Sequence, residues 1–397
     1  MRETVRTLLI DADGLTRKAI AADTFLKGML NLSPVSPLAV WMRSYRIGQH
    51  VWGPRNDFLS YVLDWREAIC EAPELEVDVC NATNLVHYRQ SLKKIKQYAL
   101  TVILHSATGD SVSLLRGRTE QLNDRRGKLV VFVGNEYNLL DQKINFLKTV
   151  NADYICSQLP EEAANWLYQE CVGSRVLSLP HALNPKVYFP IPEVDQVVDF
   201  GFIGDLYHDL IGDRERTDLI RFFIDRGKEL GLTCDIRSQR LPRAQWVDFL
   251  RRCKGMLGAE SGTYYLDRTG QRIEGARQYV KTHRKALFEE VHSLFFKGAT
   301  NTISGKAISS RHFEPVGTRT CQLLIEGKYN GILKANEHYI PVKRDLSNIE
   351  EAVRKFKDDA YRLLIANKAY EYVLSSHTYK HRVDSLLKLV LGELPLS

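Results

Sequence analysis

Two short apolar runs decide the fold class: TVILHSA at Thr101–Ala107 and KLVVFVG at Lys128–Gly134. Each has the character of a β-strand and ends in small or polar residues. Three further runs of this kind lie on either side of them, namely RTLLIDA, NADYICSQ and SRVLSLPHA. Helical patterns such as QSLKKIKQYAL and LPEEAANWLYQEC lie between the runs. Strands that alternate with helices predict an α/β fold with a parallel, doubly wound sheet.

The ends of these predicted strands carry polar side chains. Ligands of such sheets bind at the carboxyl ends of the strands, which here are marked by His105, Asn135, Glu136 and Ser157. His105 and Glu136 are therefore candidates for a general base, because an imidazole or a carboxylate can take a proton from a substrate hydroxyl. The alternative for both is a packed or solvated side chain.

A second alternation of strands and helices follows a proline-rich crossing. LPHALNPKVYFPIPEV, residues 179–194, has four prolines without periodicity, as expected of a linker or an extended crossing. The chain then has the pattern of a strand in VVDFGFIGDLY and of a helix in RTDLIRFFIDRGKELG. A second strand in LTCDIRS and a second helix in RAQWVDFLRRCKG follow. GMLGAESGTYYLDRTGQR reads as a strand and a turn, residues 271–300 as an irregular polar insertion, and the chain from Asn348 to the end as helices.

The two halves therefore share one architecture, and we expect two Rossmann-like domains that face a cleft. The expected limits are 1–185 for the N-terminal domain and 186–375 for the C-terminal domain. Residues 376–397 are expected to form a C-terminal helix that packs back towards the N-terminal domain.

The composition narrows the class of protein. The chain has 397 residues, more than one core usually supports, and no apolar stretch near the roughly 20 residues that a membrane span needs. The N-terminal run reads as a first strand and not as a signal peptide, so we expect a cytoplasmic protein. The formal net charge of +7 is compatible with an ordinary basic protein, or with attraction to phosphates or an acidic membrane face.

Two further features argue against other classes. The seven cysteines are scattered without a CxxC spacing, so neither a disulfide framework nor a zinc site is indicated. No nucleic-acid-binding motif is present, and we expect no nucleic-acid partner.

LLIDADGL, residues 8–15, offers one enzymatic interpretation. A strand followed by two aspartates, Asp11 and Asp13, is typical of haloacid-dehalogenase-like phosphatases. Leu15, however, stands where that motif has a threonine or valine, and no later acidic pair for magnesium is convincing. A turn at the end of a strand, with aspartate and glycine chosen for its geometry, explains the segment equally simply.

FGFIGD, residues 200–205, is a strand that gives way to glycine. Gly201 and Gly204 could let the backbone approach a phosphate, with Arg214 and Arg216 nearby, although a tight strand-to-helix turn fits as well.

SSRHFEPVGTRTCQLL, residues 309–324, is more specific. Arginine forks match phosphate oxygens, and a fixed carboxylate can hold a ribose diol. The segment therefore predicts a site for a nucleotide diphosphate, for which the candidate residues are Arg311, His312, Glu314, Thr318, Arg319 and Thr320. A helix start, with Glu314 favoured by the helix dipole, is the alternative.

These residues carry a family resemblance. Four segments carry it, namely Arg311-His312-Phe313-Glu314, Gly317-Thr318, Gln322-Leu323-Leu324 and Ser376-His377-Thr378-Tyr379-Lys380-His381-Arg382. They resemble the group-one, GT-B type glycosyltransferases, in particular the branch similar to spore maturation proteins. GAESG at 258–262 and EGKYNGILKANEHYIPVKRDLSN at 326–348 resemble transferases of bacterial surface-polysaccharide clusters. The resemblance covers roughly residues 195–390 and is weaker in VGNEYN, ADYICSQ and LPHALNP.

The resemblance implies a function and its parts. The protein would move a sugar from a nucleotide-diphosphate donor, held by the C-terminal domain, to a glycan or lipid-linked acceptor, held by the N-terminal domain. Glu314 would hold the donor ribose, while Arg311, Arg319 and the Gly204 turn would stabilise the leaving diphosphate. No metal and no cofactor other than the donor would be needed, and peripheral contact with the inner membrane face is expected.

One departure from the family pattern concerns the sugar. Many retaining members have a second glutamate eight residues before the ribose glutamate, where this chain has Lys306. Glu260 or Asp267 could supply that acid from another segment, and His338 could touch the donor; each is also compatible with a turn residue. The stereochemical outcome therefore stays open, as does the alternative of a nucleotide-binding protein without catalysis.

Overall fold

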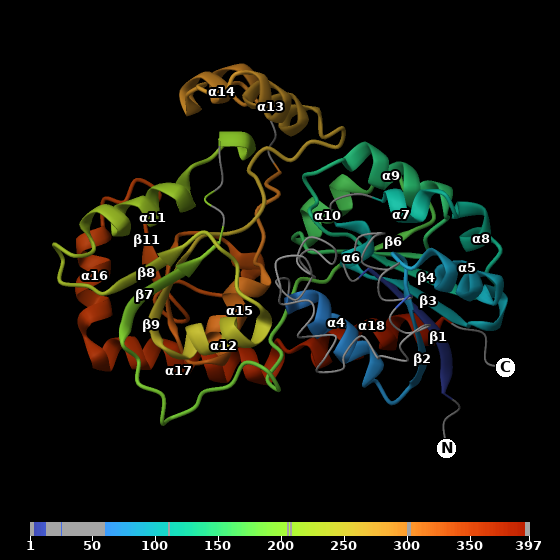
Figure 1. The fold of residues 1–397 in the computed structure, drawn as a ribbon, viewed down its shortest axis with the longest axis horizontal. Helices are drawn as coiled ribbons and strands as arrows, with labels where there is room; N and C mark the ends of the chain where they lie inside the picture. The colour runs from blue at the N-terminus through green and yellow to red at the C-terminus, as the bar shows by residue number, and fades with distance from the viewer. Residues whose placement is uncertain are drawn as a thin grey trace.

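The computed structural model of the protein describes residues 4–12, 25, 60–109, 112–204, 206, 209–299 and 303–393. Within them, the chain forms two parallel sheets with helices around each (Figure 1). The predicted α/β fold with two Rossmann-like halves is confirmed. The limits 1–185, 186–375 and 376–397 stay our proposed division of the chain.

The N-terminal half is built on a six-stranded sheet of order β2-β1-β3-β4-β5-β6, in which all pairs are parallel. Its strands are β1 (Val5–Asp11), β2 (Leu75–Asn81), β3 (Leu100–Ile103), β4 (Lys128–Phe132), β5 (Tyr154–Ser157) and β6 (Arg175–Ser178). Its helices are α4 (Ser60–Cys70), α5 (Leu85–Lys93), η2 (Ile95–Gln97), α6 (His105–Thr108), α7 (Ser113–Arg116), α8 (Thr119–Asn123), α9 (Leu140–Thr149) and α10 (Glu161–Leu167).

Both faces of this sheet are covered, which explains why its strands are apolar runs without alternation. Leu129 and Val131 of β4 point to the core that lies under α5, α8, α9 and α10. Val130 and Phe132 point to the opposite core, which contains Trp65 of α4. Helix α18 (Tyr379–Gly392) also packs on that second face.

The C-terminal half has a five-stranded parallel sheet of order β11-β10-β9-β7-β8. Its strands are β7 (Val198–Ile203), β8 (Cys234–Arg237), β9 (Cys253–Gly258), β10 (Cys321–Ile325) and β11 (Ile340–Val342). Its helices are η3 (Asp209–Ile211), α11 (Glu215–Arg226), α12 (Arg243–Arg251), α13 (Gln271–Thr282), α14 (Phe288–Phe295), α15 (Ser310–Gly317), η4 (Tyr329–Gly331), α16 (Ile349–Lys357) and α17 (Asp359–Ser376).

The chain crosses between the two halves twice, and the crossings lie side by side. The proline-rich segment carries the chain from β6 to β7, and the turn between α17 and α18 carries it back. Leu183 of the first crossing donates its N–H to His377 O at 2.9 Å, and Tyr379 N–H donates to Leu183 O at 3.0 Å. The C-terminal helix therefore returns to the N-terminal half, as Figure 1 shows.

Residues 271–300 correct one expectation. The segment was expected to be an irregular polar insertion, but it contains two helices, α13 and α14, which form a hairpin standing above the rest of the molecule in Figure 1. A small apolar core of its own, with Ile273, Ala276 and Val291, holds the hairpin together and joins it to Ile211. The many charged residues of the segment explain the error, because Phe288, Val291 and Phe295 of α14 do follow the i, i+3, i+7 spacing of an amphipathic helix.

No helix in the part of the chain that the structure describes is long and apolar enough to cross a membrane.

Candidate active site

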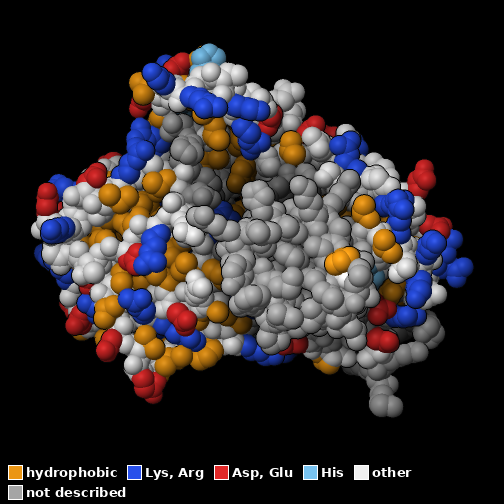
Figure 2. Space-filling model, in the orientation of Figure 1, with side chains coloured by type: hydrophobic (Ala, Val, Ile, Leu, Met, Phe, Trp, Pro, Cys, Tyr) orange, Lys and Arg blue, Asp and Glu red, His pale blue; other side chains and the backbone are white. Residues whose placement is uncertain are grey.

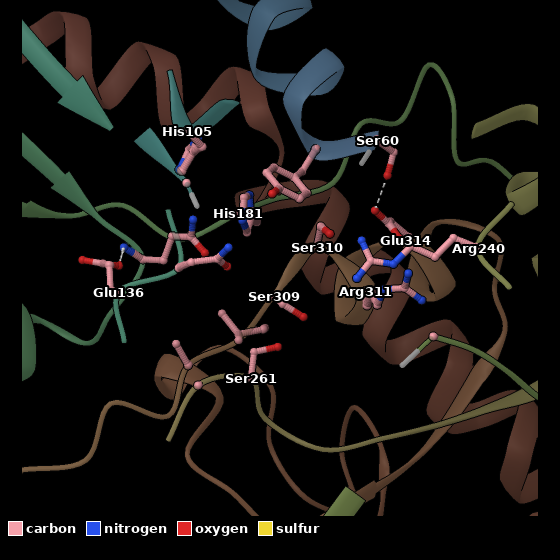
Figure 3. A pocket seen from close by; sticks show the side chains of 18 of the residues that line it. Ser60, His105, Glu136, His181, Arg240, Ser261, Ser309, Ser310, Arg311 and Glu314 are labelled. Atoms are coloured by element: carbon pink, nitrogen blue, oxygen red, sulfur yellow. Dashed lines mark hydrogen bonds between the residues drawn. The ribbon is translucent and has the colours of Figure 1, made fainter. Parts of the chain in front are cut away.

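A cavity of about 450 Å³ lies between the two halves. Both sheets direct their carboxyl ends towards it, because its walls come from the segments that follow β3, β4, β5, β6, β7, β8 and β9. His105, Glu136 and His181 line the N-terminal wall, and Arg311 and Glu314 line the C-terminal wall (Figure 3). The cavity is thus where parallel α/β sheets usually bind ligands.

Glu314 lies in the middle of helix α15 and is buried. One carboxylate oxygen accepts a hydrogen bond from Ser60 Oγ at 2.7 Å, and the other accepts from Trp246 Nε1 at 2.7 Å. Ser60 begins α4 of the N-terminal half, whereas Trp246 belongs to α12 of the C-terminal half. Glu314 is therefore a contact between the two halves as well as a cavity residue.

Four arginines line the C-terminal side of the cavity: Arg216, Arg240, Arg243 and Arg311. Arg311 donates to Ile203 O at the end of β7, and its guanidinium lies 5.1 Å from the centre of the Trp246 ring. The acids that line the cavity are Glu136 and Glu314, among the residues described. Positive charge therefore dominates this wall, which suits a phosphate-bearing ligand.

Arg243 has a second role, because it ties the two halves together. Its guanidinium donates to Glu67 Oε1 and Oε2 at 2.7 and 2.8 Å and also contacts Asp64, both on α4. Asn184 of the proline-rich crossing donates to Asp64 Oδ1 at 2.8 Å. This interdomain cluster of Asp64, Glu67, Asn184 and Arg243 reaches the cavity through Arg243, which is one of its lining residues.

The start of α15 faces the cavity through Ser309, Ser310 and Arg311 (Figure 3). His312 fixes the direction of this helix: its Nδ1 accepts from Ser309 N–H at 3.0 Å, and its Nε2 lies 3.1 Å from Ala259 O. Burial lowers the pKa of His312 to about 4, so the ring is neutral and Nε2–H donates to the carbonyl. His312, a candidate nucleotide contact, therefore positions the helix instead of lining the main cavity.

His105 forms part of the N-terminal wall and packs among aromatic rings. Its ring centre lies 5.1 Å from that of Phe132 and 5.2 Å from that of His181. Both ring nitrogens are buried and have no hydrogen-bond partner among the described residues. Burial, with a smaller contribution from His181, holds the pKa of His105 well below its ordinary value. A neutral imidazole with two unused nitrogens is suited to hydrogen bonding with a hydroxyl group.

Glu136 also lines the cavity, but its carboxylate is engaged. Ser157 Oγ and Tyr168 OH donate to Oε1 at 2.6 and 2.7 Å, and Gln158 N–H donates to Oε2 at 2.8 Å. Burial raises the pKa of Glu136, although these hydrogen bonds oppose the rise. The arrangement joins the ends of β4 and β5, and a structural role explains it without catalysis.

Other candidate residues lie away from the cavity. Thr318 and Thr320 are buried, share a hydrogen bond of 2.9 Å, and Thr320 Oγ1 donates to Leu250 O. Arg319 lies 4.6 Å over the ring of Tyr370 at the opposite end of α15 from the cavity. These three residues were expected at the diphosphate, but the helix runs away from the cavity and carries them with it. The candidate site is therefore formed without them.

The possible acids for the sugar are also placed elsewhere. Glu260 accepts a hydrogen bond from Tyr329 N–H at 2.6 Å, and neither it nor Asp267 lines the cavity. Lys306, at the position where a second glutamate was considered, pairs with Asp213 at 2.9 Å. His338 stacks on Tyr372, with 4.5 Å between the ring centres. Gly204, by contrast, does line the cavity beside Arg311.

Several cavity residues were not predicted from the sequence. Arg240, Arg243, Trp246, Ser60 and His181 all line the cavity. His181 Nδ1 lies 3.3 Å from Trp65 Nε1 and accepts its hydrogen, and burial lowers the pKa of His181 to about 3. His181 lies three residues after β6 ends at Ser178, so the rule of strand ends could have identified it.

The phosphatase motif finds no support in the geometry. Asp11 pairs with Arg66 at 3.0 Å and does not line the cavity. Asp13 and Leu15 lie outside the described residues. Within the described residues, no group of three or more His, Cys, Asp or Glu side chains is arranged to hold a metal ion.

The fold and the cavity define a class of architecture: two Rossmann-like domains with the ligand site between them, which is the GT-B fold. Solved structures with this fold agree over nearly the whole chain. An alpha-glucosyltransferase in complex with UDP and a 13-mer DNA is 11% identical, with a TM-score of 0.54 and coverage of 98% of this chain and 100% of that one. The sucrose-phosphate synthase of Thermosynechococcus elongatus is 10% identical, with a TM-score of 0.53 and 98% coverage of both chains.

BGT of phage T4, solved with its UDP-glucose substrate, is 9% identical with a TM-score of 0.51 and covers 97% of this chain and 99% of that one. At these identities the likeness shows the fold. A comparison of the sequence with curated proteins found no match.

A family model described as glycosyl transferase-like matches residues 216–388, which is less than half of the chain. The matched region runs from α11 to α18 and includes α15 with Glu314. The coarse part of the predicted resemblance, a glycosyltransferase of the GT-B type, is thus supported by both the fold and the family model. The narrower branch similar to spore maturation proteins stays a prediction.

Proposed function

We propose that the protein transfers a sugar from a nucleotide-diphosphate donor to a glycan or lipid-linked acceptor, in the synthesis of a cell-surface polysaccharide on the cytoplasmic side of the membrane. The observation that carries the proposal is the interdomain cavity, with an arginine-rich wall and the start of α15 on its C-terminal side. A nucleotide diphosphate carries two adjacent anionic groups, which match such a wall. The glycosyl transferase-like match of residues 216–388 supports the same assignment.

The donor would be held by groups that face one another. We place its diphosphate beside Arg311, Arg216 and Arg240, and its ribose at Glu314. In the structure both oxygens of Glu314 already accept hydrogen bonds, one of them from Ser60 of the N-terminal half. Ribose binding would thus replace the Ser60 hydroxyl with a ribose hydroxyl, which requires only a small opening between the halves.

The proposed catalysis rests on the stabilisation of negative charge on the leaving group by arginine side chains. As the bond from the sugar to the diphosphate breaks, negative charge grows on the leaving oxygen, and fixed guanidinium groups stabilise it without reorganisation. His105 and His181 on the opposite wall are neutral and would bind sugar or acceptor hydroxyls by hydrogen bonds. The low pKa of His105 makes it a weak proton acceptor, so we propose it for binding more than for the general-base role considered from the sequence.

We further propose that transfer needs no metal ion, because arginines supply the positive charge that a bound cation would otherwise provide. Transfer is therefore expected to persist at an unchanged rate after dialysis against EDTA. A loss of activity in EDTA that Mg²⁺ or Mn²⁺ restores would contradict this part of the proposal.

A thermal-shift screen of nucleotides and nucleotide sugars tests the proposal as a whole. A ligand at 100 times its Kd stabilises the folded state by about 2.7 kcal/mol, which raises the Tm measurably. We expect a nucleoside diphosphate and the corresponding nucleotide sugar to raise the Tm. In a separate assay with acceptor present, we expect the nucleotide sugar to be converted to free nucleoside diphosphate. Binding without turnover on any acceptor would favour a non-catalytic nucleotide-binding protein, and no response to any nucleotide would refute the proposal.

A further inference from the structure

The helical hairpin of α13 and α14 is an excursion from the wall of the cavity. It leaves the wall after Gly262 and returns at Gly305, both of which line the cavity. Ser261 and Ala307 close the base of the excursion with two backbone hydrogen bonds of 2.9 Å, and Gly305 N–H donates to Thr263 O at 2.9 Å. The position of the hairpin is therefore fixed relative to the cavity.

The hairpin also contacts the N-terminal half. Arg277 Nη1 donates to Asn138 Oδ1 at 2.8 Å. Arg268 Nε donates to Trp166 O at 2.9 Å, and its guanidinium lies 4.2 Å from the centre of the Trp166 ring. The hairpin thus contacts both halves on one side of the molecule, where it stands above the rest of the chain (Figure 1). Its far end contacts the C-terminal half, since Glu289 pairs with Arg214, whose guanidinium also lies over the ring of Phe288.

The far end of the hairpin is strongly basic. Lys281, Arg284 and Lys285 are exposed and have no ion-pair partner among the described residues. The acids of the hairpin, in contrast, all have partners within the molecule: Glu274 pairs with Arg277, Glu289 with Arg214, and Glu290 accepts a hydrogen bond from Tyr279. Figure 2 shows the resulting concentration of lysine and arginine side chains over the hairpin.

Two leucines are exposed beside these cations. Leu287, at the start of α14, is 68% exposed, and Leu294 is 57% exposed. Leu287 is the N-cap residue of α14 and Leu294 lies in its last turn, on either side of Val291, which is buried in the small core. The hairpin therefore presents apolar side chains and unpaired cations to the solvent together.

We propose that the tip of this hairpin, Lys281 to Leu294, docks the protein on an anionic lipid bilayer. Lysine and arginine side chains are attracted to anionic headgroups, and leucines next to them can enter the boundary between headgroups and acyl chains. A polyanion such as DNA would neutralise the cations but leave both leucines in water. The combination of the two kinds of side chain therefore favours a bilayer over a nucleic acid.

Docking in this way would hold the cavity at the length of α13, about 18 Å, from the membrane surface, because the base of the hairpin is part of the cavity wall. An acceptor with a lipid anchor could then reach the cavity without leaving the bilayer. This consequence rests on the proposed function, but the docking itself does not.

The test is co-sedimentation of the full chain with vesicles of phosphatidylcholine alone and of phosphatidylcholine mixed with phosphatidylglycerol. We expect binding to the mixed vesicles that weakens with added salt. Replacing Lys281, Arg284 and Lys285 together by alanine should lower the partition coefficient roughly 100-fold. Each cation near such a surface contributes about 1 kcal/mol, which corresponds to an approximately fivefold change in the partition coefficient. The double variant Leu287→Ser, Leu294→Ser should lower it at least about 10-fold.

Matched controls separate the tip from general charge and apolarity. Lys93, Lys94 and Lys388 are exposed lysines without ion pairs in the described chain, and their joint replacement by alanine should leave binding unchanged. Val172→Ser with Leu363→Ser, at side chains that are 94% and 51% exposed, controls for the leucines. The thermal shift with nucleotides should be the same in all variants, so failure of docking and failure of the proposed function are distinguishable.

Two results would overturn the proposal. One is equal binding of wild type and tip variants to anionic vesicles, or no binding by either. The other is binding to duplex DNA or to free phosphate that depends on the three cations but not on the two leucines, which would make the tip a polyanion site.

Discussion

At the scale of single residues, Glu314 is the centre of the proposed donor site. Glu314→Gln keeps the shape of the side chain but removes the charge and one of its two acceptor positions. We expect kcat/KM for the nucleotide sugar to fall about 10- to 100-fold, because a hydrogen bond to a charged group is worth about 1.5–3 kcal/mol. Glu314→Ala should abolish transfer.

The measurement is steady-state kinetics with circular dichroism as a control of folding. The Gln variant should retain the wild-type spectrum, since the amide oxygen can accept from Trp246 Nε1–H while the amide N–H donates to Ser60 Oγ. Near-normal turnover in either variant would show that Glu314 does not hold the donor.

Arg240 gives an independent test of the arginine wall. It is exposed at the cavity, so Arg240→Ala should leave stability within about 0.5 kcal/mol of wild type. The KM for the donor should rise about 10-fold, because a guanidinium contact to phosphate is lost. Arg237→Ala is the matched control, since Arg237 is exposed in the same segment, pairs with Asp235 and does not line the cavity. Equal effects of the two variants would exclude a specific phosphate contact.

The sequence predicted those cavity residues whose pattern lies within a few neighbouring positions of the chain. His105 follows a strand directly, and Arg311 and Glu314 share one turn of helix, so short spacings were sufficient to place them. Ser60 and Trp246 hydrogen-bond to Glu314 from positions 254 and 68 residues away, and no local pattern contains such contacts. Thr318 and Thr320 were expected at the diphosphate, but they lie at the end of α15 that is away from the cavity, and the contact of His312 with Ala259, which helps to fix that helix, is made across the fold.

At the scale of elements, α15 is fixed at both ends. Its start is held by His312, and its end packs on the proline-rich crossing, where a Cβ on Gly317 would lie 2.5 Å from Leu183 Cδ1 and 2.8 Å from Tyr188 O. Gly317→Ala is therefore expected to lower the free energy of unfolding by about 1–3 kcal/mol, measured by urea denaturation.

Gly117→Ala is the matched control, because a Cβ there would have no atom within 4 Å and its φ is −74°. If both variants were as stable as wild type, α15 would not be packed as described.

Elements with both faces buried were predicted best. β1, β3 and β4 were all expected as strands, from the runs RTLLIDA, TVILHSA and KLVVFVG. The hairpin of α13 and α14 was missed, although Phe288, Val291 and Phe295 of α14 follow the i, i+3, i+7 spacing of an amphipathic helix. The many charged residues of α13 and of the turn after it hid that spacing when the segment was interpreted as a whole.

At the scale of the whole molecule, the interdomain cluster makes stability depend on pH. Burial raises the pKa of Asp64 to about 7, although Arg243 opposes the rise. In the unfolded chain this carboxyl titrates near 3.8, so the folded protein binds the proton more tightly. The free energy of unfolding should therefore fall as the pH rises from about 4 to about 7, by at most about 1.4 kcal/mol per pH unit.

Asp64→Asn removes this titration, so the variant should show a smaller fall between those pH values in urea denaturation. Glu136 and Glu215, whose pKa values burial also raises, affect wild type and variant alike. Burial opposes the shift of Glu67, but Arg243 lowers its pKa below the ordinary 4.5, so Glu67 contributes with the opposite sign and only up to about pH 4.5. Identical slopes in wild type and variant would show that Asp64 is ionised at all these pH values.

A crystal structure with the nucleoside diphosphate that gives the largest thermal shift tests the central claim most directly. We predict that the diphosphate lies against Arg311 and the start of α15, with the ribose hydroxyls at the Glu314 carboxylate in place of Ser60 Oγ. A nucleotide bound outside the interdomain cavity, or within it with its ribose away from Glu314, would contradict the account.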